Sequence, residues 1–351
     1  MSNSVFSLLL IEWYLRHQRD LPWRQTSDPY KIWLSEIMLQ QTRVSQGLPY
    51  YLSFIKKYPT VKKLAQAPEK EVLRQWQGLG YYSRARNLHR CAKIVSDELK
   101  GWFPQTVDEL KKLPGIGDYT AAAIASLAFA KPAAVVDGNV FRVLSRLFEI
   151  NIDITSPAGK KHFFELANRL IPHDQPGAFN QAIMEFGAVH CVPRNPKCDA
   201  CIFTKTCLAN KNGTQHLFPV KSKSKKKRVR YFNYFVIRSG KKIWMRQRLE
   251  KDIWQGLNEF YLIESPRKLS DGKAIQLVEK EMGLNSLFPL TKSKRIDQTL
   301  SHQQIIGKFF DIELSENSAP KKLKSGKFYS SKVIETLAKP VIIMEYLKGL
   351  G

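Results

Sequence analysis

Acidic residues and long hydrophobic runs are both scarce in this sequence. Its 351 residues include 31 Asp and Glu against 56 Lys and Arg, a formal net charge of +25 at pH 7. This excess favours a polyanionic partner, because each phosphate that a basic side chain neutralises releases counterions. No apolar run is long enough for a membrane span, and the apolar stretch 5–15 contains Glu12 and follows no basic residue. We expect a core helix there, no membrane partner, and a protein that is cytoplasmic, or nuclear in a cell that has a nucleus.

Cysteine is scarce as well, which excludes a fold stapled by many disulfides. Four of the five cysteines crowd into residues 191–207 with the spacing C-x6-C-x2-C-x5-C. In a reducing compartment such crowding points to a metal centre. Zinc ribbons pair two C-x2-C knuckles, whereas this loop has one. Cys91, the fifth, is expected to be a buried small apolar residue.

The pattern of residues divides the chain into two domains. Residues 1–208 predict helix after helix, punctuated by Pro and Gly. Residues 209–230 predict a basic linker, since seven of the ten residues from 221 to 230 are Lys or Arg. Residues 231–351 predict an α+β domain. Its expected strands span 231–238, 242–248, 260–264, 305–314 and 327–329, and its helices span 271–282 and follow Ser331 and Pro340.

A Gly-rich turn, Leu113-Pro-Gly-Ile-Gly117, joins helical stretches at 107–113 and 119–130. Gly115 and Gly117 leave their N–H groups uncovered just before a helix begins, so a phosphate would bind well there. The turn therefore predicts a helix-hairpin-helix that binds DNA. An ordinary turn between two helices is the structural alternative.

Two carboxylates stand out. Glu36 lies in the apolar helical run 30–39, where ionisation is costly, so its pKa should rise above the reference of about 4.3 and make it a proton donor. A structural ion pair with Arg24 is the alternative. Asp137 precedes a helix over 140–148, where an N-cap is the structural interpretation.

An ordered series of motifs over residues 1–208 resembles the adenine DNA glycosylases of the MutY family, in the endonuclease III superfamily. The motifs are Leu21-Pro-Trp-Arg24, Trp33-Leu-Ser-Glu-Ile-Met-Leu-Gln-Gln-Thr42, Gly78-Leu-Gly-Tyr-Tyr82, Leu113-Pro-Gly-Ile-Gly117 and Val136-Asp-Gly-Asn-Val140. The resemblance implies an all-α helix-hairpin-helix glycosylase domain with an iron–sulfur loop, followed by a smaller α+β Nudix-like domain.

The resemblance also implies the chemistry. Glu36 would protonate adenine N7, while Asp137 would stabilise the oxocarbenium-like sugar or attack it, much as paired carboxylates do in glycosidases. Tyr119 and Asn139 would be their hydrogen-bond partners. Relatives that also cleave the strand carry a Lys at position 119, so Tyr119 predicts an essentially monofunctional enzyme.

The implied partner is double-stranded DNA with adenine mispaired with 8-oxoguanine or guanine, bound by a monomer that in a bacterium would associate with the nucleoid. Gln41 and Tyr81 match residues that wedge into the base stack, although a core position is the alternative for Tyr81. Gln181 would contact the flipped adenine. The remaining residues assigned to DNA in this domain are Arg24, Leu79, Gly115 and Gly117.

The second domain matches the family more thinly. Residues 276–284 resemble a worn Nudix box that keeps Glu281 and Gly283 but has too few carboxylates for Mg²⁺. The fold is therefore expected without pyrophosphatase activity. Ser301 and His302 match a loop that reads 8-oxoguanine, with Leu300 in place of the family Phe. An exposed turn without DNA contact is the alternative.

Two other functions compete. An endonuclease III-like lyase acting on oxidised pyrimidines is disfavoured by Tyr119 and by Glu36 in its apolar helix. A catalytically silent DNA-binding module would keep the hairpin and the cysteines but has no reason to keep both Glu36 and Asp137.

The cysteine loop gives a first prediction. Cys191, Cys198, Cys201 and Cys207 match the iron–sulfur loop of the superfamily, which implies a [4Fe–4S] cluster. Protein made with an intact iron supply should be brown and contain about four iron and four sulfide per chain. Metal and sulfide analysis of purified protein measures this, and stoichiometric zinc would contradict it.

Overall fold

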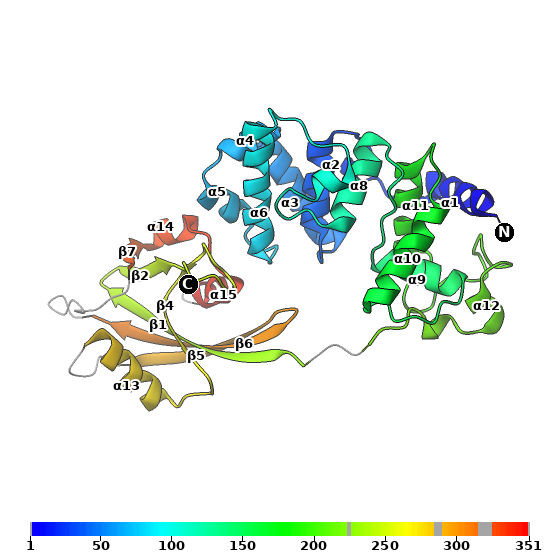
Figure 1. The fold of residues 1–351 in the computed structure, drawn as a ribbon. Coiled ribbons are helices and arrows are strands. Elements are labelled where there is room, and N and C mark those ends of the chain that lie inside the picture. The colour runs from blue at the N-terminus through cyan, green and yellow to red at the C-terminus, as the bar shows by residue number, and fades with distance from the viewer. Residues whose placement is uncertain (1, 223–225, 284–289, 315–324, 350–351) are drawn as a thin grey trace. The chain divides into compact units, whose positions relative to one another are not determined.

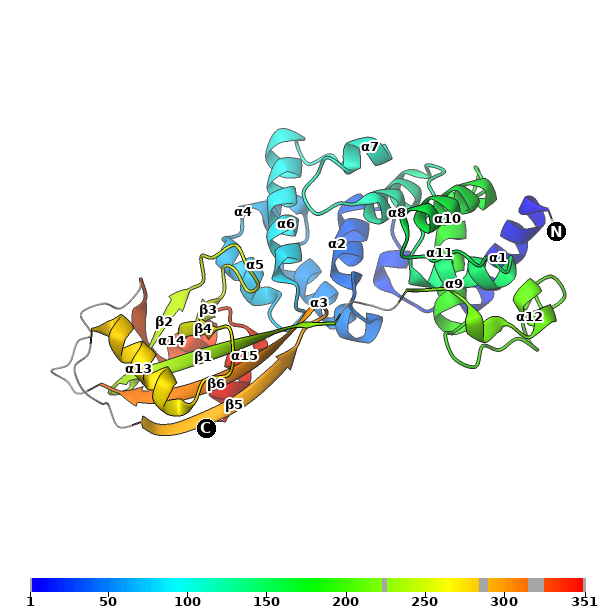
Figure 2. The ribbon, with the colours of Figure 1, turned by 60° about the horizontal axis from the view of Figure 1, so that its bottom comes forward.

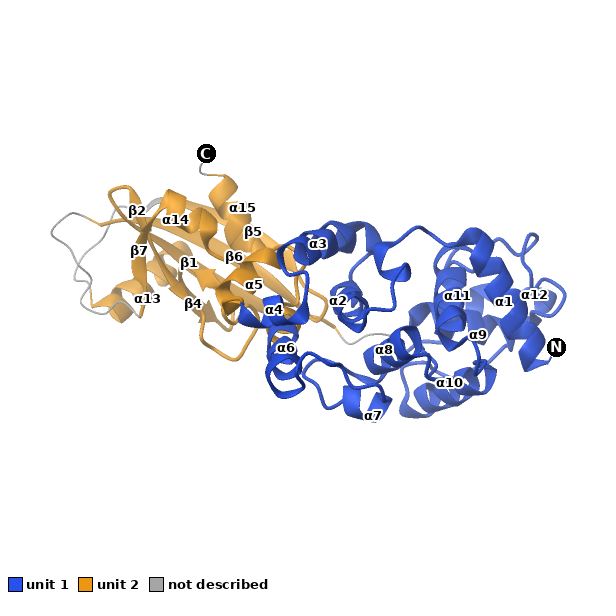
Figure 3. Cartoon of the chain, turned by 90° about the horizontal axis from the view of Figure 1, so that it is seen from above, with its two compact units in different colours: residues 1–66, 87–224 blue, residues 67–86, 225–351 orange. Residues whose placement is uncertain are grey.

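The computed structural model describes residues 2–222, 226–283, 290–314 and 325–349. The chain forms two compact units (Figure 3): residues 1–66 and 87–224 make the first, and residues 67–86 and 225–351 make the second. Across the described residues, no helix is both long and apolar enough to cross a membrane.

Helices build the first unit, as the sequence predicts (Figure 1). They are α1 (Asn3–His17), η1 (Pro22–Arg24), α2 (Pro29–Leu39), α3 (Val44–Lys57), α4 (Val61–Gln66), α6 (Tyr82–Lys93, shared with the second unit), η2 (Ile94–Glu98), α7 (Val107–Leu110), α8 (Asp118–Phe129), α9 (Gly138–Leu147), α10 (Pro157–Leu170), α11 (Pro176–Val189), α12 (Leu208–Asn212) and η3 (Gln215–Leu217). Asp28 and Asp137 begin α2 and α9 by accepting hydrogen bonds from N–H groups of the first turn, which supports the N-cap interpretation of Asp137.

One core cluster of the first unit joins α1, α8, α9, α10 and α11. Aromatic rings from distant parts of the chain meet there: Phe6 lies 6.1 Å from Phe179 and 5.1 Å from Phe203 between ring centroids. The core also holds α9 against α11, and thereby fixes the start of α9, where Asp137 lies.

A mixed sheet forms the second unit (Figure 2). Its strands are β1 (Arg228–Ser239), β2 (Lys242–Gln247), β3 (Asn258–Glu259), β4 (Tyr261–Ser265), β5 (Leu290–Thr299), β6 (Gln303–Glu313) and β7 (Lys327–Ser330). Its helices are α5 (Glu69–Gln75), α13 (Asp271–Met282), α14 (Ser331–Thr336) and α15 (Val341–Lys348), with the start of α6. β1 pairs in parallel with β6 and antiparallel with β2 and β4, and β5 pairs antiparallel with β6.

Helices cover both faces of this sheet, with α13 on one side and α15 on the other (Figure 1). Phe310 faces the cluster that contains Val278 of α13, while its neighbour Phe309 stacks on Tyr346 of α15 at 4.5 Å between centroids. Successive side chains of a strand point to opposite faces, so β6 contributes side chains to the packing against both α13 and α15. The predicted α+β Nudix-like domain is confirmed, although β3 and β5 were not predicted.

Gly187 of α11 lies directly against Asn139 of α9. A Cβ at this position would lie 2.6 Å from the Cβ of Asn139. Gly187→Ala should therefore destabilise the first unit by about 1–3 kcal/mol, the usual cost of overpacking. Denaturant unfolding followed by circular dichroism measures this. Gly138→Ala in α9 is the matched control, because its added Cβ would meet nothing within 4 Å; equal stability of the two variants would show that the helices are not tightly packed at Gly187.

Candidate active site

A cleft of about 1080 Å³ in the first unit contains the two predicted carboxylates. Glu36 enters it from α2, Tyr119 from α8, and Asp137 from the start of α9. Gln41 and Gly117 also line it. Residues separated by a hundred positions in the sequence are thus brought to one cleft, as two acids acting on one substrate would require.

Glu36 is buried in α2, with 9% of its surface exposed. The pKa of its carboxyl is raised from 4.5 to about 7, chiefly by burial and also by the charge of Asp137, while a hydrogen bond with Tyr119 and the charge of Arg24 partly oppose this rise. A carboxyl with this pKa is partly protonated near neutral pH and can donate its proton.

Tyr119 links Glu36 to α11. Burial raises the pKa of its hydroxyl well above 10, so the group stays protonated. The hydroxyl lies 3.1 Å from the Sδ of Met184 and also bonds Glu36. Its single proton cannot serve both, and a thioether is a weak acceptor. Tyr119 therefore donates to Glu36 when that carboxylate is ionised, and can accept from it when it is protonated.

Asp137 lies among hydrogen-bond donors. Its Oδ1 accepts from the N–H groups of Asn139 and Val140 at 2.9 and 2.8 Å, and its Oδ2 accepts from the Asn139 side chain at 2.9 Å. Burial raises the pKa of Asp137, while these donors and the charge of Arg142 oppose that rise. Arg142 Nη2 in turn donates to the Asn139 side-chain oxygen at 2.8 Å, which fixes the amide orientation.

Arg24 pairs with Glu185, not with Glu36. Its Nη2 lies 2.6 Å from Glu185 Oε2, and Arg19 Nη2 lies 2.6 Å from the same oxygen. Hydrogen bonds to both arginines outweigh the effect of burial and lower the pKa of Glu185 to about 2. Sequence reasoning missed Glu185, and its position as an acidic residue within the apolar helix α11 was the one available signal.

The residues assigned to the flipped base and the phosphates lie as follows. The Oε1 of Gln181, on α11, accepts a hydrogen bond from the Tyr14 hydroxyl. Gly115 has a φ of +80°, a conformation that favours glycine. A Cβ there would also lie 2.9 Å from the Cβ of Asn87.

Tyr81 and Leu79 belong to the second unit. Tyr81 is 38% exposed with a φ of +49°, which does not support the core alternative. Leu79 is buried, with 5% of its surface exposed.

Ser301 and His302 form the tip of the β5–β6 hairpin and are exposed. Leu300 N–H donates to Gln303 O at 2.8 Å and closes the turn, and the Ser301 hydroxyl lies 3.3 Å from His302 Nδ1. The hairpin therefore presents both polar side chains to solvent, where a ligand could meet them.

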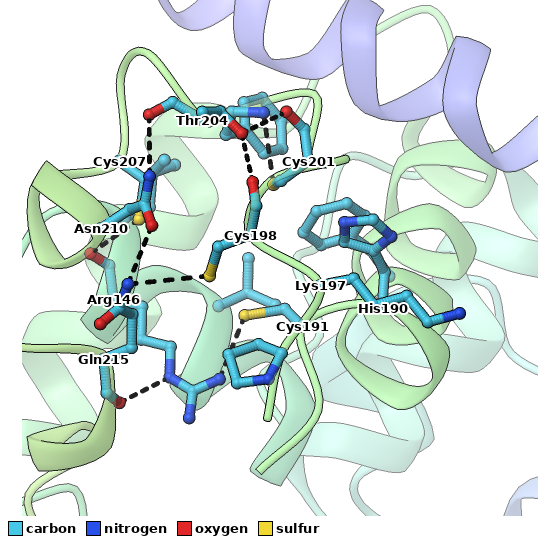
Figure 4. Close-up of a pocket in the computed structure, with 15 residues that line it drawn as sticks. Arg146, His190, Cys191, Lys197, Cys198, Cys201, Thr204, Cys207, Asn210 and Gln215 are labelled. Carbon is cyan, nitrogen blue, oxygen red and sulfur yellow. Dashed lines mark hydrogen bonds between the residues drawn. The ribbon is translucent and has the colours of Figure 1, made fainter. Parts of the chain in front are cut away.

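The four clustered cysteines line one pocket (Figure 4). N–H donors face their sulfur atoms: Arg146 Nη1 lies 3.5 Å from Cys191 Sγ, and Phe203 N lies 3.4 Å from Cys201 Sγ. Such donors stabilise thiolate ligands. Among the described residues, no group of three or more His, Cys, Asp or Glu side chains could hold a single metal ion. Cys91 lies elsewhere and is buried, as expected.

Comparisons with known proteins agree with this geometry. Residues 34–171 match the HhH-GPD superfamily base excision DNA repair proteins, and residues 233–349 match the NUDIX domain. The chain is 38% identical over 258 residues to the adenine DNA glycosylase of Buchnera aphidicola from Schizaphis graminum, covering 73% of this chain and 74% of that protein. The chain belongs to the adenine DNA glycosylase family.

Other members and neighbours of the adenine DNA glycosylase family support this membership. The Buchnera aphidicola protein from Acyrthosiphon pisum is 34% identical over 288 residues, or 82% of this chain and 81% of that protein. A thermostable thymine-DNA glycosylase superposes with a TM-score of 0.55 at 34% identity, over 60% of this chain and 97% of its own. A non-covalent endonuclease III–DNA complex, at 23% identity, TM-score 0.51 and 61% and 99% coverage, supports the fold alone.

The buried Glu36 predicts how stability depends on pH. The folded pKa is about 7 and the unfolded value is 4.5, so between these values the folded chain keeps a proton that the unfolded chain has lost. The contribution of Glu36 to stability therefore falls as pH rises through this window. Glu36→Gln cannot titrate, and should be more stable than the wild type at pH 8 but not at pH 4.

Urea unfolding of both proteins across pH 4–8 measures this difference. The matched control is Glu165→Gln, which removes an exposed carboxylate of α10 and should leave the pH dependence unchanged. A constant difference between Glu36→Gln and the wild type would show that Glu36 titrates normally.

Proposed function

We propose that this chain is a monofunctional DNA glycosylase that hydrolyses the N-glycosidic bond of adenine mispaired with 8-oxoguanine or guanine. One observation carries the proposal: a buried carboxyl with a pKa of about 7 shares a cleft with a second carboxylate that is held by hydrogen-bond donors. That the excised base is adenine is inferred from the relatives named adenine DNA glycosylase.

Glu36 acts as the general acid. It donates its proton to N7 of the flipped adenine, so that the electrons of the breaking C1′–N9 bond leave with a neutral base. Asp137 faces the positive charge that develops on the sugar and stabilises it. Water then adds hydroxide to C1′ and releases a proton, which restores the acid and leaves an abasic site. Tyr119 supplies no amine for a Schiff base, so the strand stays intact.

DNA lies along the cleft, whose lining includes lysines beside its carboxylates. Lys111, Lys160 and Lys161 line it and can neutralise phosphates, and the hairpin N–H groups near Gly115 and Gly117 add a further phosphate site. Because Tyr14 donates to Oε1 of Gln181, the Nε2 of this amide is the group left to donate to the base. Tyr81 and Gln41 would fill the space that the flipped adenine leaves.

The four cysteines of the pocket fit a [4Fe–4S] cluster, whose ligands stand farther apart than those of one metal ion because the cluster lies between them. Endonuclease III-like proteins commonly hold such a cluster. Here Cys191, Cys198, Cys201 and Cys207 would bind it, and it would shape the loop. Lys197 lies in this pocket as well, so the loop can present positive charge to phosphate.

The proposed organisation is a glycosylase domain over 1–208, a linker over 209–230 and a lesion-reading domain over 231–351. The enzyme would act as a cytoplasmic monomer, associated with the nucleoid if its source is bacterial. Tyr261 donates a 2.7 Å hydrogen bond to Glu281, so the surviving box carboxylate is engaged in the fold. This engagement supports a second domain that reads DNA without Nudix hydrolysis.

The proposed roles of the carboxylates predict the behaviour of two variants. Glu36→Gln and Asp137→Asn should each reduce single-turnover adenine release by about 10² or more, since the first loses the proton and the second the stabilising charge. Both should still bind the duplex, because the shape is kept and no positive charge is lost.

Duplexes with adenine opposite 8-oxoguanine, guanine or thymine measure these effects, with alkali revealing abasic sites. Samples without alkali test monofunctionality, since strand breaks in them would indicate lyase activity. Near wild-type rates in Glu36→Gln would assign the proton to another group. Near wild-type rates in Asp137→Asn would leave Asp137 as a helix cap alone.

The exposed hairpin tip predicts how the lesion is read. Replacing both Ser301 and His302 by Ala should weaken the preference for 8-oxoguanine over guanine opposite adenine by about 1–3 kcal/mol, the usual range for lost base contacts. Single-turnover rates at one fixed salt concentration measure the preference. Unchanged preference would assign lesion reading elsewhere and leave this tip as a surface turn.

A further inference from the structure

Residues 67–86 belong to one domain by sequence and to the other by packing. They fall within the match to base excision repair proteins, which spans 34–171. Their contacts nevertheless place them in the second compact unit, with the residues that match the NUDIX domain. The segment contains α5 and the turn 76–82, which presents Tyr81.

Backbone strain makes this turn dependent on support. Gly78, Gly80 and Tyr81 have φ values of +104°, +76° and +49°. Residues with a side chain, such as Tyr81, rarely adopt this conformation and are strained in it. Within the turn, Trp76 Nε1 donates to Gly80 O at 3.0 Å, and the Arg84 guanidinium lies 5.4 Å from the centroid of the Tyr81 ring.

Further support comes from the segment between α14 and α15. Lys339 N–H donates to Gln77 Oε1 at 3.0 Å, and Lys339 O accepts from the Tyr82 hydroxyl at 3.3 Å. That hydroxyl also accepts from Gly78 N–H at 3.3 Å. Tyr82 therefore connects the strained backbone of the turn to Lys339, whose own ammonium donates to Leu337 O at 2.7 Å.

The loop 248–257 gives a second attachment. Arg86 Nη1 donates to Gln255 O at 2.6 Å, and a Cβ at Gly256 would lie 3.0 Å from Leu73 Cδ1 of α5. Bonds within this loop tie it together: Gly256 N–H donates to Arg248 O at 2.8 Å, and Arg248 pairs with both Asp252 and Glu259. Two parts of the NUDIX-matching region thus contact the segment.

We propose that the NUDIX-matching region sets the conformation of the turn 76–82, and so positions Tyr81, through Lys339 and the loop 248–257. Gln77, Tyr82 and Arg86 are the positioning residues. Because Tyr81 is the residue that enters the duplex under the proposed function, on which this inference rests, the lesion-reading domain would control how readily adenine leaves the stack.

The test combines Gln77→Met with Tyr82→Phe in the full chain, which removes both bonds to Lys339 and keeps side-chain volume. The matched control is Tyr261→Phe, which removes the hydrogen bond that the Tyr261 hydroxyl donates to Glu281. Tyr261 lies on the sheet face that packs against α13. Two readouts are measured beside thermal unfolding: the ¹⁹F resonance of 3-fluorotyrosine placed at position 81, without DNA, and the rate at which 2-aminopurine opposite 8-oxoguanine unstacks.

The double variant should shift or broaden the resonance of position 81 and slow unstacking by about tenfold, as expected for the loss of both bonds to Lys339 and of the Gly78–Tyr82 bond, while the control changes neither. An unchanged resonance would overturn the inference whether or not the enzyme releases adenine. A changed resonance with wild-type unstacking would overturn the control of base flipping. Failure of the wild type to release adenine, with a changed resonance, would reject the proposed function and leave the positioning intact.

Discussion

The burial of one carboxyl, that of Glu36, is the constraint on which the site depends. The apolar helix α2 buries this carboxyl away from water, and this burial is the main reason that its pKa is raised to about 7. A nearby free guanidinium would undo this, because a close positive charge favours the ionised form. Arg24 lies near enough to lower the pKa, but Glu185 pairs with it at 2.6 Å. The carboxylate of Glu185 thus takes the ion pair that Arg24 could otherwise offer to Glu36.

Burial raises the pKa of Asp137 as well, but more hydrogen-bond donors oppose that rise than at Glu36. Two backbone N–H groups, one side-chain amide and the charge of Arg142 all favour its ionised form, whereas one hydroxyl serves Glu36. Different environments push paired acids toward different roles. The donors around Asp137 exist only because α9 begins there, and α9 is held by its close approach to α11 at Gly187. The packing of α9 on α11 therefore determines which hydrogen-bond donors surround Asp137.

The parts of the site that sequence could predict are the local ones. The apolar run around Glu36 and the helix that follows Asp137 can both be recognised within about ten residues of sequence. The structure agrees with the raised pKa expected for Glu36 and with the N-cap expected at Asp137. Glu185 was missed because its partners lie 161 and 166 residues away. β5 was missed because its residues 291–299 are mostly polar, so its pairing with β6, and not its own pattern, makes it a strand.

Contacts between residues distant in the sequence also explain why the two compact units do not follow the domain boundaries predicted from the sequence. Residues 67–86 lie far from the second domain in sequence, and bonds to Lys339 and Gln255 bring them into its unit. Tyr81 and the Ser301–His302 tip then belong to one compact unit, while Glu36 and Asp137 belong to the other. Under the proposed function, one unit opens the duplex and reads the lesion, and the other breaks the bond. A strained turn such as 76–82 is suited to join the two tasks, because a residue held at a φ of +49° keeps that conformation only while its surroundings impose it.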